Sequence, residues 1–273
     1  MTSQAKTAKP RFNYIDNLNL IVTPIFAAIL IILAATVWNY SEFDQTTENI
    51  LRPSLLISQL WETILIGILS SLIVIAVAVP LGITITRRGY PGLKTFLVDS
   101  LGLAQALPAY GLIVVFYTFL GTGMPTAIYA LALFSLLPVL RNTIVGLEQV
   151  DRSVIDAGRG MGYTNLQILF KIELPLAIPI IIAGIRTAVV INVGMAALAF
   201  LVGAGGLGET INSGLKLNRP TAIFIGASLV AILALVLDFL GALAEKYLKP
   251  KGIYLTRFIS HSPQPLLIHI TSK

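Results

Sequence analysis

The chain has 273 residues, of which 56% are hydrophobic and 12% are charged, and its mean hydropathy is +0.84. Because a soluble domain carries about 25% charged residues, this composition excludes a soluble globular protein and indicates one that crosses a membrane several times. No cysteine is present, and both histidines, His261 and His269, lie near the C-terminus. Disulfides, thiolate chemistry and a histidine metal site within the membrane are therefore excluded.

The N-terminal region predicts a polar segment over residues 1–19 and a first membrane helix from Leu20 to Trp38. A cleaved secretory signal is the alternative, but its apolar core is usually no longer than about 15 residues and ends in a small-residue cleavage pattern. The run here is longer and lacks that pattern. We therefore expect an uncleaved membrane helix, followed by a polar loop over residues 39–59.

Five further apolar segments are long enough to cross the membrane. They span residues 63–86, 98–120, 124–140, 174–202 and 220–244. Six crossings predict an all-α membrane protein, because helices satisfy their own backbone hydrogen bonds in lipid. The predicted parts are an N-terminal segment at 1–19, a transmembrane domain at 20–248 and a C-terminal tail at 249–273.

The positions of Lys and Arg predict the orientation. Six crossings place both termini on one side, together with residues 87–97 and 141–173. Fifteen of the 19 Lys and Arg residues lie on that side, Arg186 lies in the fifth segment, and three lie on the other side, namely Arg52, Lys216 and Arg219. By the positive-inside rule the termini and residues 141–173 are cytoplasmic. This distribution also explains the net charge of +6 without nucleic-acid binding.

The longest polar interval between two apolar segments is residues 141–173. Asp151 is expected to cap a short helix with an apolar side at Val154, Ile155, Gly158 and Met161, which Gly160 and Gly162 end. Thr164 and Gln167 form a capping box for a second helix, with Leu166, Leu169 and Phe170 on one face. Pro175 then suits the first turn of the next membrane helix. The small residues of this interval would let another protein approach its backbone.

A gapped motif runs through this interval and consists of Asp156, Ala157-Gly158, Gly162, Ile172 and Leu174-Pro175. It resembles the Glu-Ala-Ala loop of ABC importer permease subunits, with Asp for Glu at 156 and Gly for the second Ala at 158. The resemblance covers about residues 55 to 250. In that family the loop is the coupling helix, which docks into a groove on the ATP-hydrolysing subunit.

Shorter segments resemble the osmoprotectant permeases of this family, which carry glycine betaine, carnitine or choline. These segments are residues 105–108, 137–143, 183–188 and 203–208. The resemblance implies alternating access by two permease subunits, identical or paralogous, in the inner membrane of a prokaryote. It also implies a separate ATPase that binds ATP and Mg, and an extracytoplasmic substrate-binding protein.

Two alternatives stay open at this point. An importer for methionine or another small solute would share the coupling loop. A stand-alone secondary transporter would more often show an internal repeat and ionisable residues at mid-membrane. The chain contains no G-x-x-x-x-G-K-[ST] motif, so we expect it to be a transport subunit that is not itself an enzyme and binds no cofactor.

The glycines at 203, 205 and 208 match the dinucleotide-binding pattern G-x-G-x-x-G. That function needs a preceding strand and a βαβ unit, and here the pattern follows a membrane helix. A turn is the better interpretation. We expect Gly203, Gly205, Gly206 and Gly208 to form part of an outer gate or a surface that docks the substrate-binding protein.

Several polar residues lie within the predicted membrane helices. Arg186 must face protein or water, and we expect an ion pair with Asp99 or Asp238, with substrate contact as the alternative. Asn192 lies among small residues that indicate either close helix packing or the lining of a pathway. Four aromatic residues could offer π faces to a quaternary ammonium group, although membrane packing is the favoured explanation: Tyr110, Phe116, Tyr117 and Phe119.

Overall fold

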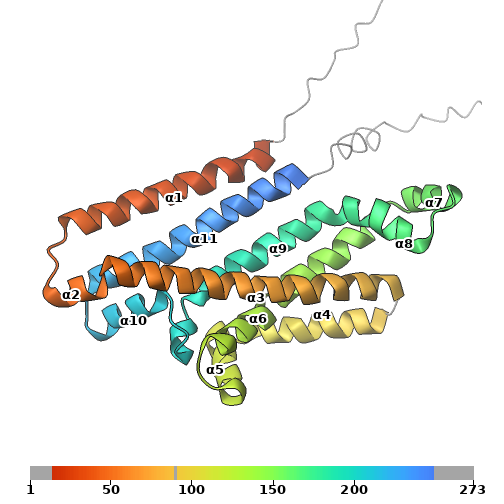
Figure 1. The fold of residues 1–273 in the computed structure, drawn as a ribbon. Helices are drawn as coiled ribbons and strands as arrows, with labels where there is room; N and C mark the ends of the chain where they lie inside the picture. Colours follow the sequence, from red (N-terminus) through yellow and green to blue (C-terminus); the bar gives the residue numbers. More distant parts are fainter. Residues whose placement is uncertain (1–13, 89–90, 249–273) are drawn as a thin grey trace, which may run out of the picture.

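The computed structural model describes residues 14–88 and 91–248, and every regular element in these ranges is helical (Figure 1). The α-helices are α1 (Tyr14–Tyr40), α2 (Gln45–Ile50), α3 (Pro53–Arg88), α4 (Pro91–Ala106), α5 (Ala109–Leu120), α6 (Met124–Glu148), α7 (Arg152–Gly160), α8 (Asn165–Ile168), α9 (Leu174–Ala196), α10 (Gly208–Lys216) and α11 (Pro220–Leu248). The all-α prediction is confirmed. The N-terminal segment before residue 14 and the tail at 249–273, with both histidines, lie outside the described residues.

Helices α3, α6 and α9 pack against one another at the centre of the structure. Two glycines allow this close packing. A Cβ atom at Gly82 would lie 2.7 Å from Thr143 Cγ2, and one at Gly184 would lie 2.6 Å from Asn142 Cβ. Small residues are the usual means by which membrane helices approach closely, because lipid supplies no hydrophobic drive for association.

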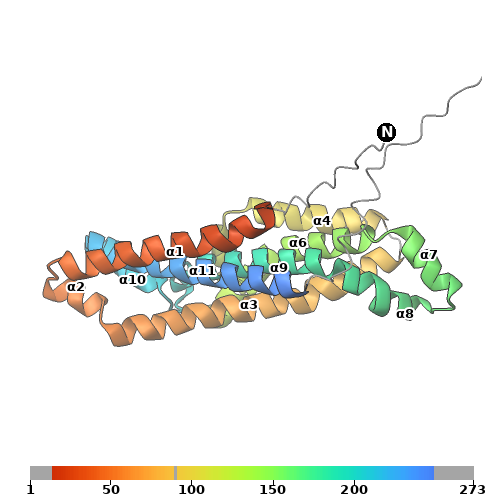
Figure 2. The ribbon, with the colours of Figure 1, turned by 90° about the horizontal axis from the view of Figure 1, so that it is seen from above.

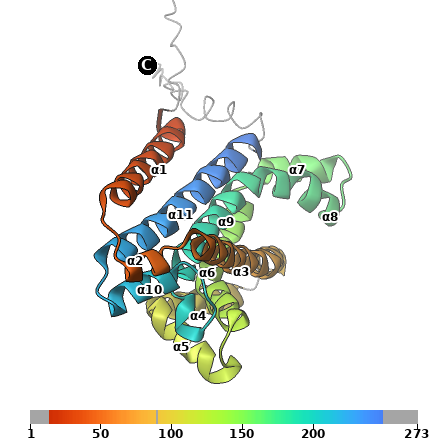
Figure 3. The same cartoon turned by 60° about the vertical axis from the view of Figure 1, so that its left-hand side comes forward.

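Helix α1 lies along α11 (Figure 2), while α4 and α5 flank the central helices on the opposite side (Figure 3). The exposed face of α1 is strongly apolar, with Ile25, Phe26, Ile29 and Ile32 among its outward side chains. Such a face suits contact with lipid. Five helical stretches are long and apolar enough to cross a membrane, or six if α4 and α5 form one bent crossing.

The predicted third crossing over residues 98–120 is not one helix. Helix α4 ends at Ala106, α5 begins at Ala109, and their axes differ by 101°. Pro108 has no N–H to continue the helix, and its ring restricts the backbone of Leu107. Gln105 Nε2 donates to the Phe134 carbonyl at 2.8 Å, which ties the end of α4 to α6.

Helix α6 is longer than predicted. It continues past Leu140 to Glu148 because Leu140, Ile144 and Leu147 remain buried at helical spacing. The non-helical part of the polar interval therefore begins at Gln149, whereas we predicted that the membrane helix ends before Arg141. Pro138 lies inside α6 without ending it, and Asn142 Nδ2 donates to the Pro138 carbonyl at 2.8 Å.

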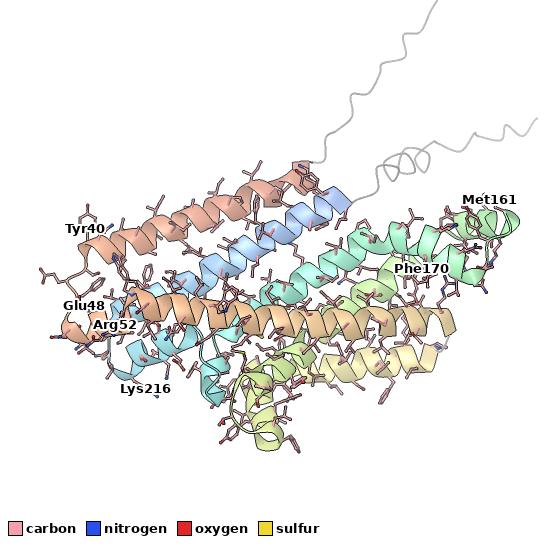
Figure 4. All side chains as sticks on the ribbon, in the orientation of Figure 1. Tyr40, Glu48, Arg52, Met161, Phe170 and Lys216 are labelled. Atoms are coloured by element: carbon pink, nitrogen blue, oxygen red, sulfur yellow. The ribbon has the colours of Figure 1, made fainter. Side chains whose placement is uncertain are left out.

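The short helices lie at opposite ends of the long ones. Helices α2 and α10 lie at one end with Tyr40, Glu48, Arg52 and Lys216, and α7 and α8 lie at the other with Met161 and Phe170 (Figure 4). The predicted orientation makes the α2–α10 end extracytoplasmic and the α7–α8 end cytoplasmic.

Candidate functional site

The first short helix of the polar interval is capped as predicted. Asp151 accepts a hydrogen bond from the Ser153 N–H at 2.8 Å, and this bond lowers the pKa of the Asp151 carboxyl below its usual value. At the other end Gly162 has φ = 81°, a left-handed conformation that disfavours side chains. Gly162 therefore reverses the chain after α7, and the space around its Cα is open.

The second short helix also has the predicted cap. Thr164 N–H donates to Gln167 Oε1 at 2.8 Å, and Gln167 N–H donates to Thr164 Oγ1 at 3.3 Å. We expected this helix to end before a new one at Pro175. Instead α8 runs through a π-helical turn, Leu169–Glu173, directly into α9. Pro175 cannot donate to the preceding turn, and the wider π turn accommodates its ring.

The motif residues divide into two groups. Gly158 and Ile172 face each other, since a Cβ at Gly158 would lie 2.6 Å from Ile172 Cδ1, and this contact packs α7 against the π turn. Leu174 joins a buried cluster with Leu147. The other group is exposed: Ala157 is open to solvent, and Asp156 pairs with Arg159 at 3.0 Å. Glycine at 158 lets α7 lie close to Ile172.

The apolar side chains of residues 154–170 pack inward only in part: Ile168 and Leu169 are buried and Ile155 is half-buried, whereas four others are exposed. Met161, Leu166 and Phe170 are 65%, 68% and 64% exposed, and Val154 is also exposed. The loop is too short to fold a core of its own, so no described element covers them. We call these four residues the α7–α8 patch. Exposed apolar side chains of this kind are typical of surfaces that contact protein or lipid.

Arg186 is paired within the structure. Its Nε donates to Asp238 Oδ1 at 2.6 Å and its Nη2 donates to Oδ2 at 2.7 Å, which is a bidentate ion pair. Glu245 Oε2 lies 3.5 Å from Nη1. Gly241 lies between the two acids, and a Cβ there would be 2.8 Å from Arg186 Cγ. Of the two predicted carboxylates the structure brings only Asp238 to Arg186.

Sequence reasoning missed Glu245. The signal was available, because Glu245 lies seven residues after Asp238 and therefore on the same face of α11, two turns away. Thr23 on α1 also donates to Asp238 Oδ2, at 3.4 Å. The ion pair thus joins α1, α9 and α11.

Asn192 is fully buried at the crossing of α3, α6 and α9. In the amide orientation that gives both its nitrogen and its oxygen a hydrogen-bond partner, the Asn192 nitrogen donates to the Leu131 carbonyl at 3.0 Å and the oxygen accepts from Ser71 at 3.0 Å. Ser135 lies within hydrogen-bond distance of both amide atoms. Asn192 therefore connects α3, α6 and α9 through its hydrogen bonds.

The glycine segment, residues 203–208, is bound to the start of α3. Glu62 Oε2 accepts from the Gly206 N–H at 2.7 Å, and Thr63 Oγ1 accepts from the Leu207 N–H at 2.9 Å. Gly203, Gly205 and Gly206 all have left-handed backbone conformations. A side chain at Gly205 would collide with Glu62. These contacts fix the segment as a tight turn.

Helix α10 begins at Gly208, where a Cβ would lie 2.7 Å from the Ala197 carbonyl carbon. Sequence reasoning identified the glycines but missed their acceptors on α3. The signal was a set of three polar residues at helical spacing near the start of an otherwise apolar crossing, namely Gln59, Glu62 and Thr63.

Comparison with known proteins decides what these features belong to. Residues 78–251 match the family of the binding-protein-dependent transport system inner membrane component. The chain belongs to this family.

Named relatives of the permease are osmoprotectant transport proteins. It is 42% identical to a carnitine transport permease protein of Listeria monocytogenes over 198 residues, which covers 72% of this chain and 90% of the relative. It is 40% identical to a choline transport system permease protein of Bacillus subtilis, over 72% of this chain and 90% of that relative.

The fold of the permease is also that of solved transporters. An inward-facing methionine ABC transporter matches with a TM-score of 0.64 and 24% identity, covering 72% of this chain and 98% of that one. An amino acid ABC transporter crystallised with histidines matches with a TM-score of 0.62 and 16% identity, covering 76% of this chain and 100% of that one.

The remaining candidate residues of the permease lie on α4 and α5. Asp99 lines a surface groove on α4 beside Thr95 and Ser100, away from Arg186. Phe116 packs against the buried core, whereas the side chains of Tyr110, Tyr117 and Phe119 are exposed. The aromatic residues are therefore not gathered into one cage.

Proposed function

We propose that this permease is the membrane-spanning subunit of an ATP-powered importer for glycine betaine, carnitine or choline. The observation that carries the proposal is the α7–α8 patch, where the coupling motif places exposed apolar side chains at one end of the molecule. A patch of this kind fits the surface of a soluble partner, because covering it removes apolar area from water. The partner is an ATPase subunit, which binds ATP and Mg that this chain has no P-loop to bind.

The connection between the patch and helix α9 supports a mechanism in which the ATPase subunit moves the membrane helices. Residues Asn165–Ala196 form one helical stretch from α8 through α9, and the glycine segment follows it. A displacement of the patch would therefore move a long rigid element whose far end reaches the opposite side of the membrane. Two permease subunits, identical or paralogous, would use this motion to expose a shared pathway to each side in turn.

The proposed assembly lies in the inner membrane of a prokaryote. Both termini and the α7–α8 patch face the cytoplasm, where ATP is available, in line with the distribution of Lys and Arg. The opposite end, with α2 and α10, faces an extracytoplasmic binding protein that delivers the solute. This chain supplies the route and the coupling, and its partner performs the hydrolysis.

The proposed substrates follow from the printed functions of the relatives, which carry carnitine, choline and glycine betaine. Methionine is the runner-up, since a methionine transporter shares the fold, but at 24% identity that likeness concerns the fold alone. A stand-alone secondary transporter would leave the α7–α8 patch without a partner.

Uptake in proteoliposomes tests the proposal. The permease is reconstituted with its ATPase and loaded binding protein, and entry of radiolabelled glycine betaine is measured with ATP or with an ion gradient alone. We expect uptake only with ATP, loss of uptake with a hydrolysis-deficient ATPase, and competition by unlabelled choline or carnitine but not methionine. Uptake driven by an ion gradient without the ATPase would refute the proposal.

A further inference from the structure

The link between the α7–α8 patch and helix α9 contains one irregular turn. It is the π-helical turn Leu169–Glu173, in which the Leu174 N–H donates to the Leu169 carbonyl five residues earlier. Pro175 has no N–H, so the bond that an α-helix would form to the Lys171 carbonyl is missing. Single π turns within helices occur frequently at functional sites. A displacement of the patch would be lost by bending at this turn unless other contacts brace it.

Two contacts hold the π turn against the loop that carries the patch. A Cβ at Gly158 would lie 2.6 Å from Ile172 Cδ1, so α7 packs directly on the turn. Lys171 Nζ lies 5.2 Å from the centroid of the Tyr163 ring, which is a cation–π contact with the connection between α7 and α8. Both contacts make the turn follow the loop when the loop moves.

Arg87 connects the same turn to α3. Its Nη2 donates to Glu173 Oε2 at 2.5 Å, and this ion pair joins the last turn of α3 to the last residue of the π turn, 86 positions away. The Glu173 side chain is only 12% exposed, and that of Arg87 is 30% exposed. A charge-assisted hydrogen bond that is partly shielded from water is stronger than one on an open surface. The pair is therefore suited to brace the π turn.

Helix α3 continues this connection along the molecule. It runs from the α2–α10 end toward the α7–α8 end (Figure 1), and Glu62 and Thr63 near its start accept hydrogen bonds from the glycine segment. Glu62 and Arg87 lie about 38 Å apart along the helix at about 1.5 Å per residue. A displacement that reaches Arg87 therefore has a second route to the glycine segment, in addition to α9.

We propose that Arg87 and Glu173 are positioning residues that carry the movement of the α7–α8 patch to α3. With the ion pair intact, the π turn is braced, and α3 and α9 move together when the ATPase displaces the patch. Without the pair the ATPase still docks, but part of its movement is absorbed by bending at the π turn. This inference rests on the proposed function and names two residues through which docking is coupled to transport.

Separate measurements of docking and coupling test the proposal, because neither residue belongs to the α7–α8 patch. Glu173→Gln removes the charge and keeps the size of the side chain. The matched control is Glu148→Gln, which removes the carboxylate of the Lys94–Glu148 ion pair, 2.7 Å long, between α4 and α6. Each variant is placed in nanodiscs, and its thermal stability, its affinity for the ATPase and the stimulation of ATP hydrolysis by loaded binding protein are measured.

We expect Glu173→Gln to bind the ATPase as the wild-type permease does and to reduce the stimulation at least about threefold, as changes in residues that couple two sites commonly do. Glu148→Gln should leave both quantities unchanged. A charge reversal tests the pair itself and does not depend on how well Glu173→Gln folds. Arg87→Glu should also reduce the stimulation, and adding Glu173→Arg should restore most of it, because the two charges are again opposite.

The outcomes separate this inference from the proposed function. Wild-type stimulation in Glu173→Gln, or an equal loss in Glu148→Gln, would overturn the inference alone. A loss of ATPase affinity in Glu173→Gln would overturn it in favour of a docking role, and a reversed pair that folds and docks without recovering stimulation would also contradict it. A wild-type complex that does not dock the ATPase, or that loaded binding protein does not stimulate, would remove the proposed function and this inference with it.

Discussion

Arg186 shows how a charge is accommodated within a membrane helix. Its guanidinium is bidentate to Asp238 and near Glu245, and Gly241 provides the space for its stem. An unpaired Arg in lipid costs about 2.5–3.5 kcal/mol or more. The pair removes that cost and connects α9 to α11, so its role in this conformation is structural.

Replacing Arg186 with Leu should lower folded yield and thermal stability. Two acids would be left together without a cation, and loss of one partner of a buried pair typically costs about 3–5 kcal/mol. Size-exclusion profiles of the detergent-solubilised protein measure this effect. Adding Asp238→Asn should restore much of the yield, whereas Asp99→Asn should not. Normal yield with weakened transport in R186L would instead favour a role in the pathway.

Two neighbouring glycines of the cytoplasmic loop should respond oppositely to alanine. Gly162 has a left-handed conformation, in which a Cβ costs about 1–2 kcal/mol. Gly160 lies in the last turn of α7 with open space around it, and alanine there should stabilise by about 0.4–1 kcal/mol. Hydrogen exchange of the α7 amides should be faster in G162A and slower in G160A. Equal changes would contradict this account of Gly162.

At the scale of elements, α7 and α8 combine a buried side, which includes Ile168, with exposed apolar side chains. Their caps and the Gly158–Ile172 contact fix the shape of the loop, and the α7–α8 patch is left exposed. Because α8 continues into α9, the patch is attached to a membrane helix rather than to a separate loop. The element is therefore suited to transmit a displacement.

A charge in the α7–α8 patch should weaken ATPase docking without affecting membrane insertion. Phe170→Asp removes a large apolar side chain that would be buried, worth about 1.5–3 kcal/mol, which corresponds to roughly 10- to 150-fold in affinity. Asn165→Asp adds the same charge to α8 without removing apolar area and is the matched control. Affinity of purified ATPase for the permease in nanodiscs is the measurement. Equal affinities for the two variants would show that the patch is not the docking surface.

The helix caps of these elements could be predicted from the sequence, whereas the lengths and bend angles of the helices could not. The caps at Asp151 and Thr164 involve residues within three positions of each other, so the sequence carries the whole signal. The length of α6 depends on burial against α3 and α9, and the polar character of Arg141 and Asn142 obscured it. The bend after Ala106 could be suspected from Pro108, but its angle depends on packing.

At the scale of the whole molecule, the short helices α2 and α10 lie at one end and α7 and α8 lie at the other, with the long apolar helices between them (Figure 1). The apolar segments of the sequence predicted the long helices, while the count of six crossings and the orientation stay predictions. The contact between Glu62 and Gly206 was beyond the sequence, because these residues are 144 positions apart and only the fold brings them together. The Arg186–Asp238 pair is the exception, since an Arg within a membrane helix requires a partner and few carboxylates were available.

The predicted orientation can be tested in intact cells with single cysteines. Tyr40 and Met161 are exposed at opposite ends of the molecule. A membrane-impermeant maleimide added outside should label Y40C and leave M161C unlabelled until the cells are permeabilised. Labelling of M161C but not Y40C in intact cells would reverse the orientation.

The central claim is that this permease couples a solute-loaded protein on one side of the membrane to ATP hydrolysis on the other. The most direct measurement is the ATPase rate of the complex in nanodiscs, with and without glycine-betaine-loaded binding protein. We predict that the loaded protein raises the rate with the wild-type permease and fails to raise it with the Phe170→Asp variant. A rate that the loaded binding protein leaves unchanged in the wild-type complex, once binding has been demonstrated, would contradict the claim.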